Sequence, residues 1–213
     1  MEYRKLNQAR KQFLKENKEE SYVLLNGEIP VLISAPHGVS QNRLGRYKCA
    51  EPLSLTTALY LQRQKQTYLL AKTNNNFDDA NYDDNSDYQL EIDKLVERNK
   101  ITHLIDFHCL RSSRECEVNL GTNFERNIST DKKLFQKLYN KLQQEGFVVL
   151  CDSPFVGGRQ TIAGYTKFRH ENMWTLEVEI NSKLAMVKDN HERYYKLLKI
   201  FTEWIDEINK EKD

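Results

Sequence analysis

Short apolar segments rich in branched side chains alternate with longer segments of helical periodicity along most of this chain. The segments expected to form strands are 31–35, 68–72, 101–107, 117–121, 147–151 and 175–180. Helical patterns lie at about 52–65, 85–99 and 131–145, and a last one spans about 189–207. This alternation is typical of an α/β domain with a largely parallel sheet.

The composition divides the chain into a short charged segment and one long domain. Residues 1–20 are dense in Lys, Glu, Gln and Asn, which predicts an exposed helix or a mobile arm. Residues 21–213 contain no repeat and no linker rich in Pro, Gly and Ser, so we expect a single domain. A domain of this length buries a sizeable core without disulfide bonds.

Charge and hydropathy argue against two classes of partner. The chain has 32 Lys and Arg against 31 Asp and Glu, whereas a general nucleic-acid binder shows a basic excess. No apolar run approaches the roughly 18 residues of a transmembrane helix. The N-terminal residues lack an apolar stretch and the four cysteines lack C-x-x-C spacing, which together favour a cytoplasmic protein with free thiols.

Polar side chains cluster where the expected strands end. His37 follows the strand 31–35, His108 follows the strand 101–107, and the strand 175–180 carries Glu177 and Glu179. The loop after the strand 68–72 is acidic and contains Asp78, Asp79, Asn81 and Asp83. In α/β sheets, ligands bind beyond the carboxyl ends of the strands. We therefore expect these groups to converge at one edge of the sheet.

The alternation of side chains along a strand indicates which of them share a face. Asp106 and His108 lie on one face if their strand continues through 108, and His103 then lies on the other. Two histidines and a carboxylate leave one position of a tetrahedral zinc open for water, which is the arrangement for metal-assisted hydrolysis. The alternatives are ordinary: a turn histidine at 37, a strand-end histidine at 108, and sheet-edge exposure of Glu179.

Five motifs occur in an order that resembles the N-formylglutamate amidohydrolase family. They are Ser34-Ala-Pro-His-Gly-Val39, Asp78-Asp-Ala-Asn-Tyr-Asp83, Asp106-Phe-His-Cys-Leu-Arg111, Ser153-Pro-Phe-Val-Gly-Gly158 and Thr175-Leu-Glu-Val-Glu-Ile-Asn181. The resemblance spans roughly 30–185, which is most of the chain. It implies a three-layer, phosphorylase/hydrolase-like α/β fold with a mostly parallel or mixed sheet and helices on both of its faces, related to zinc carboxypeptidases and aspartoacylases.

The resemblance also implies one zinc ion and assigns roles to individual residues. His37 and His108 match the metal histidines, and Glu179 resembles the general-base glutamate. Related zinc enzymes carry the carboxylate ligand three residues after the first histidine, where this chain has Ser40. Glu51 is the candidate replacement, and a negative charge near a helix N-terminus is its ordinary alternative.

The substrate implied by the resemblance is a small anionic amide, an N-acyl or N-formyl amino acid. Asn81 resembles an asparagine that holds the substrate carboxylate, but Tyr82 stands where its arginine neighbour is usual. We expect Asp79 to line the site as well. Guanidinium groups pair with carboxylates in bidentate fashion, so Arg111, Arg114 and Arg159 are further candidates, with Arg114 assisting catalysis.

Two alternatives to this function remain open. Tyr82 in place of arginine favours a carboxypeptidase-like enzyme or a peptidoglycan amidase. The missing carboxylate three residues after His37 favours a binding protein that retains the fold without catalysis.

Overall fold

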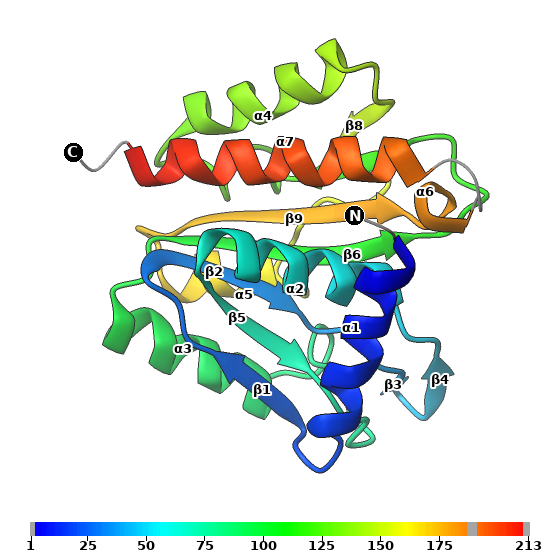
Figure 1. Ribbon diagram of the computed structural model, residues 1–213. Helices are drawn as coiled ribbons and strands as arrows, with labels where there is room; N and C mark the ends of the chain where they lie inside the picture. The colour runs from blue at the N-terminus through cyan, green and yellow to red at the C-terminus, as the bar shows by residue number, and fades with distance from the viewer. Residues whose placement is uncertain (1–2, 187–190, 211–213) are drawn as a thin grey trace.

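The computed structural model describes residues 3–186 and 191–210, and these form a mixed seven-stranded sheet with helices on both faces (Figure 1). The strands of this sheet are β1 (Tyr22–Leu25), β2 (Ile29–Ala35), β5 (Thr67–Lys72), β6 (His103–Leu110), β7 (Val118–Gly121), β8 (Val149–Cys151) and β9 (Trp174–Asn181), and β3 (Gln41–Arg43) and β4 (Arg46–Lys48) form a separate two-stranded sheet. The helices are α1 (Tyr3–Glu16), α2 (Pro52–Lys65), α3 (Asp87–Asn99), α4 (Lys132–Gln144), α5 (Ile162–Arg169), α6 (Lys183–Met186) and α7 (His191–Lys210). The expected α/β fold class is confirmed.

The sheet has the order β1-β5-β2-β6-β9-β7-β8. The central strands β5, β2, β6 and β9 run parallel to one another, whereas β1 and β7 run antiparallel to their neighbours β5 and β9. The centre of a parallel sheet is buried on both faces, and β9 accordingly has all eight residues buried. The sheet is thus mixed, with a parallel centre that brings the ends of β2, β6 and β9 together.

Two apolar clusters hold the layers against the sheet. On one face α1, α2, α4 and α7 pack over residues such as Ile33, Phe107 and Val178, and Phe107 meets Phe201 of α7 edge to face. On the other face α3 and α5 cover Leu32, Leu70 and Leu104. Of the charged segment 1–20, residues 3–16 form α1, which contributes the buried Phe13 to the first cluster. The layers therefore fix the strands from both sides.

Five elements lie outside the expected pattern. The expected loop 37–50 contains the β3–β4 hairpin, and β1, α5 and α6 form in segments for which no element was expected. The hairpin turn is Leu44-Gly45, whose positive φ angles of 50° and 73° close a two-residue connection without the usual Asn-Gly signal. The last helix was expected from about 189, but residues 189 and 190 lie outside the described part of the chain.

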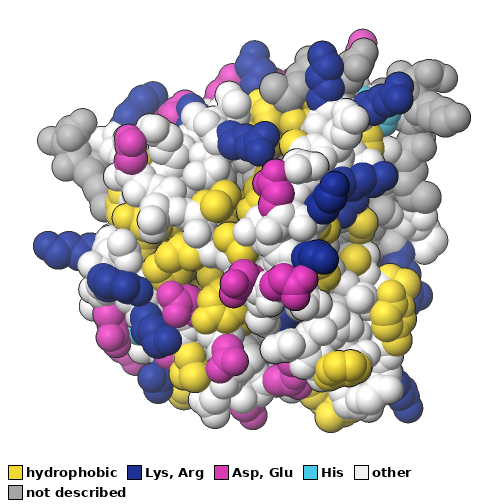
Figure 2. Space-filling view, turned by 60° about the horizontal axis from the view of Figure 1, so that its bottom comes forward, with side chains coloured by type: hydrophobic (Ala, Val, Ile, Leu, Met, Phe, Trp, Pro, Cys, Tyr) yellow, Lys and Arg dark blue, Asp and Glu magenta, His cyan; other side chains and the backbone are white. Residues whose placement is uncertain are grey.

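The surface carries charges of both signs. Figure 2 shows Lys and Arg side chains interspersed with Asp and Glu side chains over one face, with hydrophobic side chains between them. None of the described helices is long and apolar enough to cross a bilayer.

Candidate metal centre

The β3–β4 hairpin separates His37 from Glu51 in sequence, yet the two residues meet in space. The backbone N–H of Glu51 donates to the carbonyl oxygen of His37 at 2.8 Å, which closes the excursion of the chain through the hairpin. Glu51 then occupies the position before α2, but its side chain makes no capping hydrogen bond to that helix. Its carboxylate points to the histidines instead, so it is not a simple helix-end charge.

His108 lies inside β6, because this strand continues to Leu110 rather than ending at 107 as expected. The parallel register with β9 places His108 opposite Glu179 and Asp106 opposite Glu177. All four side chains therefore share one face of the sheet, at the end where β2 also terminates. His103 lies on the opposite face, beside Trp174, as its parity predicts.

The two imidazoles and the Glu51 carboxylate converge on one point. Nδ1 of His37 lies 2.9 Å from Oε1 of Glu51, and Nδ1 of His108 lies 3.3 Å from Oε2. The two Nδ1 atoms are 3.1 Å apart. Ligands of a tetrahedral zinc at about 2.1 Å lie roughly 3.4 Å from one another, so these separations are close to those of a ligand set.

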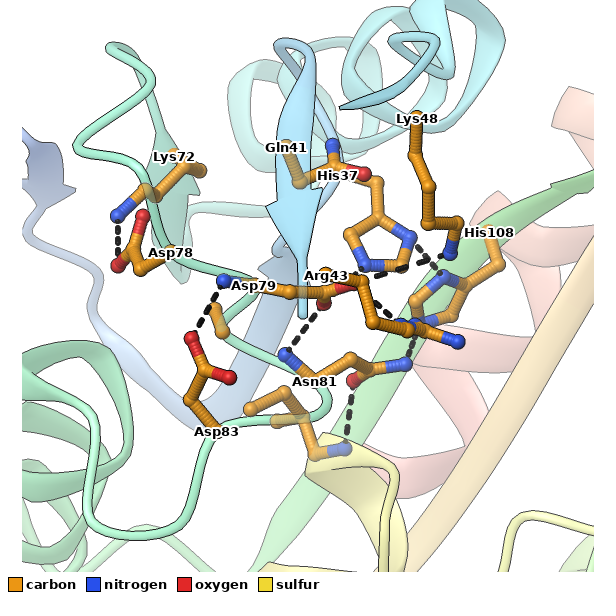
Figure 3. Close-up of polar contacts among 12 residues, drawn as sticks. His37, Gln41, Arg43, Lys48, Lys72, Asp78, Asp79, Asn81, Asp83 and His108 are labelled. Carbon is orange, nitrogen blue, oxygen red and sulfur yellow. Dashed lines mark hydrogen bonds and ion pairs between the residues drawn. The ribbon is translucent and has the colours of Figure 1, made fainter. Parts of the chain in front are cut away.

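A second carboxylate holds the far nitrogen of each ring. Asp79 contacts Nε2 of His37 at 3.0 Å (Figure 3), and Asp106 contacts Nε2 of His108 at 3.0 Å. A carboxylate at Nε2 favours the neutral tautomer with its proton on that nitrogen, and in this tautomer the lone pair of each Nδ1 faces the other ring and Glu51. Three electron-pair donors facing one another are repulsive until a cation lies between them. The donor set therefore fits a divalent metal.

The pKa values of the three candidate metal ligands depart from the ordinary values of their groups. Burial lowers the pKa of each imidazole, but Glu51 and Asp79 raise that of His37, and Asp106 and Glu51 raise that of His108, with a net rise for both. Burial opposes ionisation of Glu51, yet the two rings hold its pKa well below the usual range. The carboxylate of Glu51 is thus ionised and available as a ligand.

Glu177 and Glu179 behave in the opposite way. Burial raises the pKa of Glu177 to about 7 and that of Glu179 to about 8, although His108 offsets part of each rise. Oε2 of each side chain is buried without a hydrogen-bond partner among the described residues. Asp106, His108 and Glu177 also lie close enough to share an ion, but that set contains only one imidazole, so we favour the set with His37 and Glu51.

The three candidate metal ligands, together with Glu177 and Glu179, line a cavity of about 570 Å³. Arg111 and Arg114 are two of the candidates for substrate contact. Both lie on the wall of the cavity, and both are exposed. Arg159 does not line this cavity: its guanidinium lies over the ring of Phe168, 3.9 Å from the ring centroid. We call this space the central cavity.

Two other expected substrate contacts are engaged with the histidines. Asp79 is fully buried and absent from the lining of the central cavity, because His37 and Arg43 cover it. Asn81 does line the cavity, but its side-chain N lies 3.4 Å from Nε2 of His108 and its Oδ1 accepts from the N–H of Ile162 (Figure 3). The position of Asp79 indicates that it orients the ring of His37.

Sequence reasoning missed the cations of the hairpin. Arg43 and Lys48 line the central cavity and lie near the same Asp79 oxygen, at 2.7 Å and 3.8 Å (Figure 3). Arg43 also lies over the ring of Tyr82, 4.9 Å from its centroid. The available signal was the presence of three cations, Arg43, Arg46 and Lys48, on either side of Leu44-Gly45. Its use required recognising that this segment forms a hairpin.

We expect Asp79→Asn to weaken metal binding, because the amide cannot supply the negative charge that orients His37 and makes it a better ligand. Loss of such a partner costs about 10–100-fold in metal affinity. Competition titration against a chelating dye measures the change. Asp84→Asn is the matched control, since Asp84 is exposed on the same loop. Equal affinities of the Asp79 variant and the wild type would contradict the role of Asp79.

No protein-family model matches the chain, and a search of curated proteins finds no match. Solved structures are similar to it at low sequence identity. Gene product Atu2144 from Agrobacterium tumefaciens has a TM-score of 0.66 and 11% identity, covering 93% of this chain and 99% of that one. N-formylglutamate amidohydrolase from Ralstonia eutropha JMP134 has a TM-score of 0.59 and 13% identity, covering 89% and 97%. A metallo-carboxypeptidase from Burkholderia cenocepacia has a TM-score of 0.51 and 10% identity, covering 94% and 68%. The chain shares its fold with these proteins.

Proposed function

We propose that this protein is a zinc-dependent hydrolase of amide bonds, acting on an N-acyl amino acid or a related anionic amide. The observation that carries the proposal is the convergence of His37, Glu51 and His108 beside a buried Glu179, in a cavity lined by cations. The names of two fold neighbours, an amidohydrolase and a metallo-carboxypeptidase, support the same class of reaction.

His37, Glu51 and His108 would hold the ion, each imidazole through the nitrogen that faces Glu51. When bound, zinc supplies a water of lowered pKa and a Lewis acid for the carbonyl oxygen. Asp79 and Asp106 fix the two rings from behind and keep the proton on the far nitrogen of each. These contacts maintain the ligand geometry through the reaction.

Glu179 transfers the proton of the attacking water to the departing amine. Its Oε2 has no partner among the described residues, so it is free to accept a proton from the attacking water and to return it to the departing amine nitrogen. Burial favours the protonated form, which suits the second transfer. Arg114 on the cavity wall would oppose negative charge developing on the carbonyl oxygen, and Arg111 would hold a substrate carboxylate.

A second candidate function is a carboxypeptidase-like or peptidoglycan-trimming amidase. Tyr82 favours it, since an aromatic ring under Arg43 lines the cavity where the resemblance implies an arginine. A substrate panel separates the candidates: preference for peptides over N-acyl and N-formyl amino acids would favour the second.

Metal dependence tests the proposal directly. We expect about one zinc per chain by elemental analysis, loss of amide hydrolysis on dialysis against a chelator, and recovery on adding zinc. Stoichiometric zinc without hydrolysis of any amide in the panel would indicate a binding protein on a hydrolase fold. A chain that takes up no metal would contradict the site itself.

A further inference from the structure

The central cavity does not end at the metal ligands. A second hollow of about 460 Å³ adjoins it and shares Lys48, Glu51 and Arg111 with its wall. We call this the hairpin flank: residues 47–53, 109–111 and Ser182. A third hollow of about 370 Å³ adjoins the other side and shares Phe155, Gln160 and Glu177. We call this the loop flank: residues 154–161 with Glu177. The three hollows form one cleft with the metal ligands near its middle.

Cations lie on both flanks of the cleft. Lys48 and Arg111 lie on the hairpin flank, and Arg159 lies on the loop flank. Within the described part of the chain, neither Arg111 nor Arg159 forms an ion pair with a carboxylate. Arg159 lies over the Phe168 ring, and stacking of this kind leaves the N–H edges of a guanidinium available to a carboxylate.

The acidic groups of the cleft lie near its middle. Glu51, Glu177 and Glu179 of the cleft are buried or half-buried near its middle, where they face the metal ligands. None of the exposed residues that line the two flanks is acidic, and they include Tyr47, which is 68% exposed, and Phe155, which is 40% exposed. Exposed side chains therefore line both flanks of the cleft.

Resting on the proposed amide hydrolysis, we propose that the substrate is an extended acidic polyamide. It lies across the cleft with carboxylates on both sides of the bond that is cut. Lys48 and Arg111 bind a carboxylate on one side, and Arg159 binds one on the other. A single N-acyl amino acid would occupy only the centre and leave at least one flank unused. Hydrolysis then adds one water across an internal C–N bond, giving a carboxylic acid on one fragment and an amine on the other.

Binding to an inactive holoprotein tests the cleft independently of turnover. The probe is a fluorescent hexamer of glutamate, α-linked in one arm and γ-linked in the other, with a glutamine hexamer as the neutral comparison. We expect zinc-loaded Glu179→Gln protein to bind one of the acidic hexamers at least tenfold more tightly than the neutral one, because several charge-assisted contacts are made. Equal binding of the acidic and neutral chains would overturn the proposal.

Neutralising one arginine on each flank tests where the bound acidic hexamer lies. In the same background, Arg111→Gln and Arg159→Gln are each expected to weaken the acidic hexamer by about tenfold. Arg46→Gln is the matched control, since Arg46 is exposed on the same hairpin and lines neither the central cavity nor a flank. Unchanged affinity in both flank variants would overturn the proposal.

Turnover by the active enzyme separates this inference from the proposed function. We expect the wild type to cut the acidic hexamer at internal bonds and with a higher kcat/KM than N-acetylglutamate, as followed by mass spectrometry of the fragments. Acid-selective binding without any hydrolysis would refute the proposed function while supporting the cleft. Efficient hydrolysis of N-acetylglutamate with no advantage for the hexamer would refute the extended substrate and leave the proposed function intact.

Discussion

Replacing His108 with alanine is expected to abolish both zinc uptake and amide hydrolysis. His108 supplies one of the two imidazole nitrogens that face Glu51, and its ring also contacts His37. Loss of a partner that merely orients a ligand costs about 10–100-fold in metal affinity, so loss of the ligand itself should cost more than about 100-fold. Elemental analysis of wild type and variant side by side measures the zinc content, and an amide assay measures turnover.

The fold needs its own control, because Asp106 is fully buried and its contact with His108 is lost in the variant. His108→Gln keeps an amide that can donate to Asp106 but supplies a much poorer metal ligand. His103→Ala changes the same strand on its opposite face, beside Trp174. Circular dichroism should show that all three variants are folded. Elemental analysis should show that only the two His108 variants have lost zinc. Retention of zinc and activity by a folded His108 variant would refute the metal assignment.

Replacing Glu179 with glutamine is expected to leave zinc bound and to lower kcat by about 10²–10⁴-fold, the usual contribution of a positioned acid–base group. Glutamine has nearly the same shape and cannot accept and return a proton. Burial already favours the neutral form of Glu179, so the exchange removes no buried charge in the metal-free protein. Steady-state kinetics on the zinc-loaded variant should show the loss in kcat rather than in KM.

Glu177→Gln is the matched variant for this prediction. Glu177 lies on the same strand and face, but opposite Asp106 rather than His108. Its carboxyl also has a buried oxygen without a partner among the described residues, so the two positions are chemically alike. We expect the smaller loss at Glu177. A larger loss there than at Glu179 would transfer the proton-moving role to Glu177.

Local pattern predicted most of the fold. The segment 31–35 corresponds to β2, the helix expected at 52–65 is α2, and the strand expected at 175–180 lies within β9. These elements carry strong periodicity or a Pro at the helix start, which are local signals. β1 and the β3–β4 hairpin were missed because their short segments pair through contacts and turn conformations that the residue types do not encode clearly. β1 pairs antiparallel with β5, far from it in sequence.

The candidate site was predicted in part, and the limit was distance along the chain. His37, His108 and Glu179 stood out because each lies at or near the end of a strand. Glu51 lies fourteen positions after His37, and only the closed hairpin explains why the two residues touch. The positions of Asp79 and Arg159 also could not be read from the sequence, since one is buried behind His37 and the other lies over Phe168.

The sequence by itself determined the fold class and the chemistry that is available: strands and helices in alternation, histidines and glutamates near strand ends, and a balanced charge. These follow from side-chain period and residue type, which act over a few neighbouring positions. Only the tertiary structure decided which groups meet. The register of β6 on β9 and the return of the hairpin to His37 place donors together, because packing of the whole sheet, rather than any local preference, fixes both.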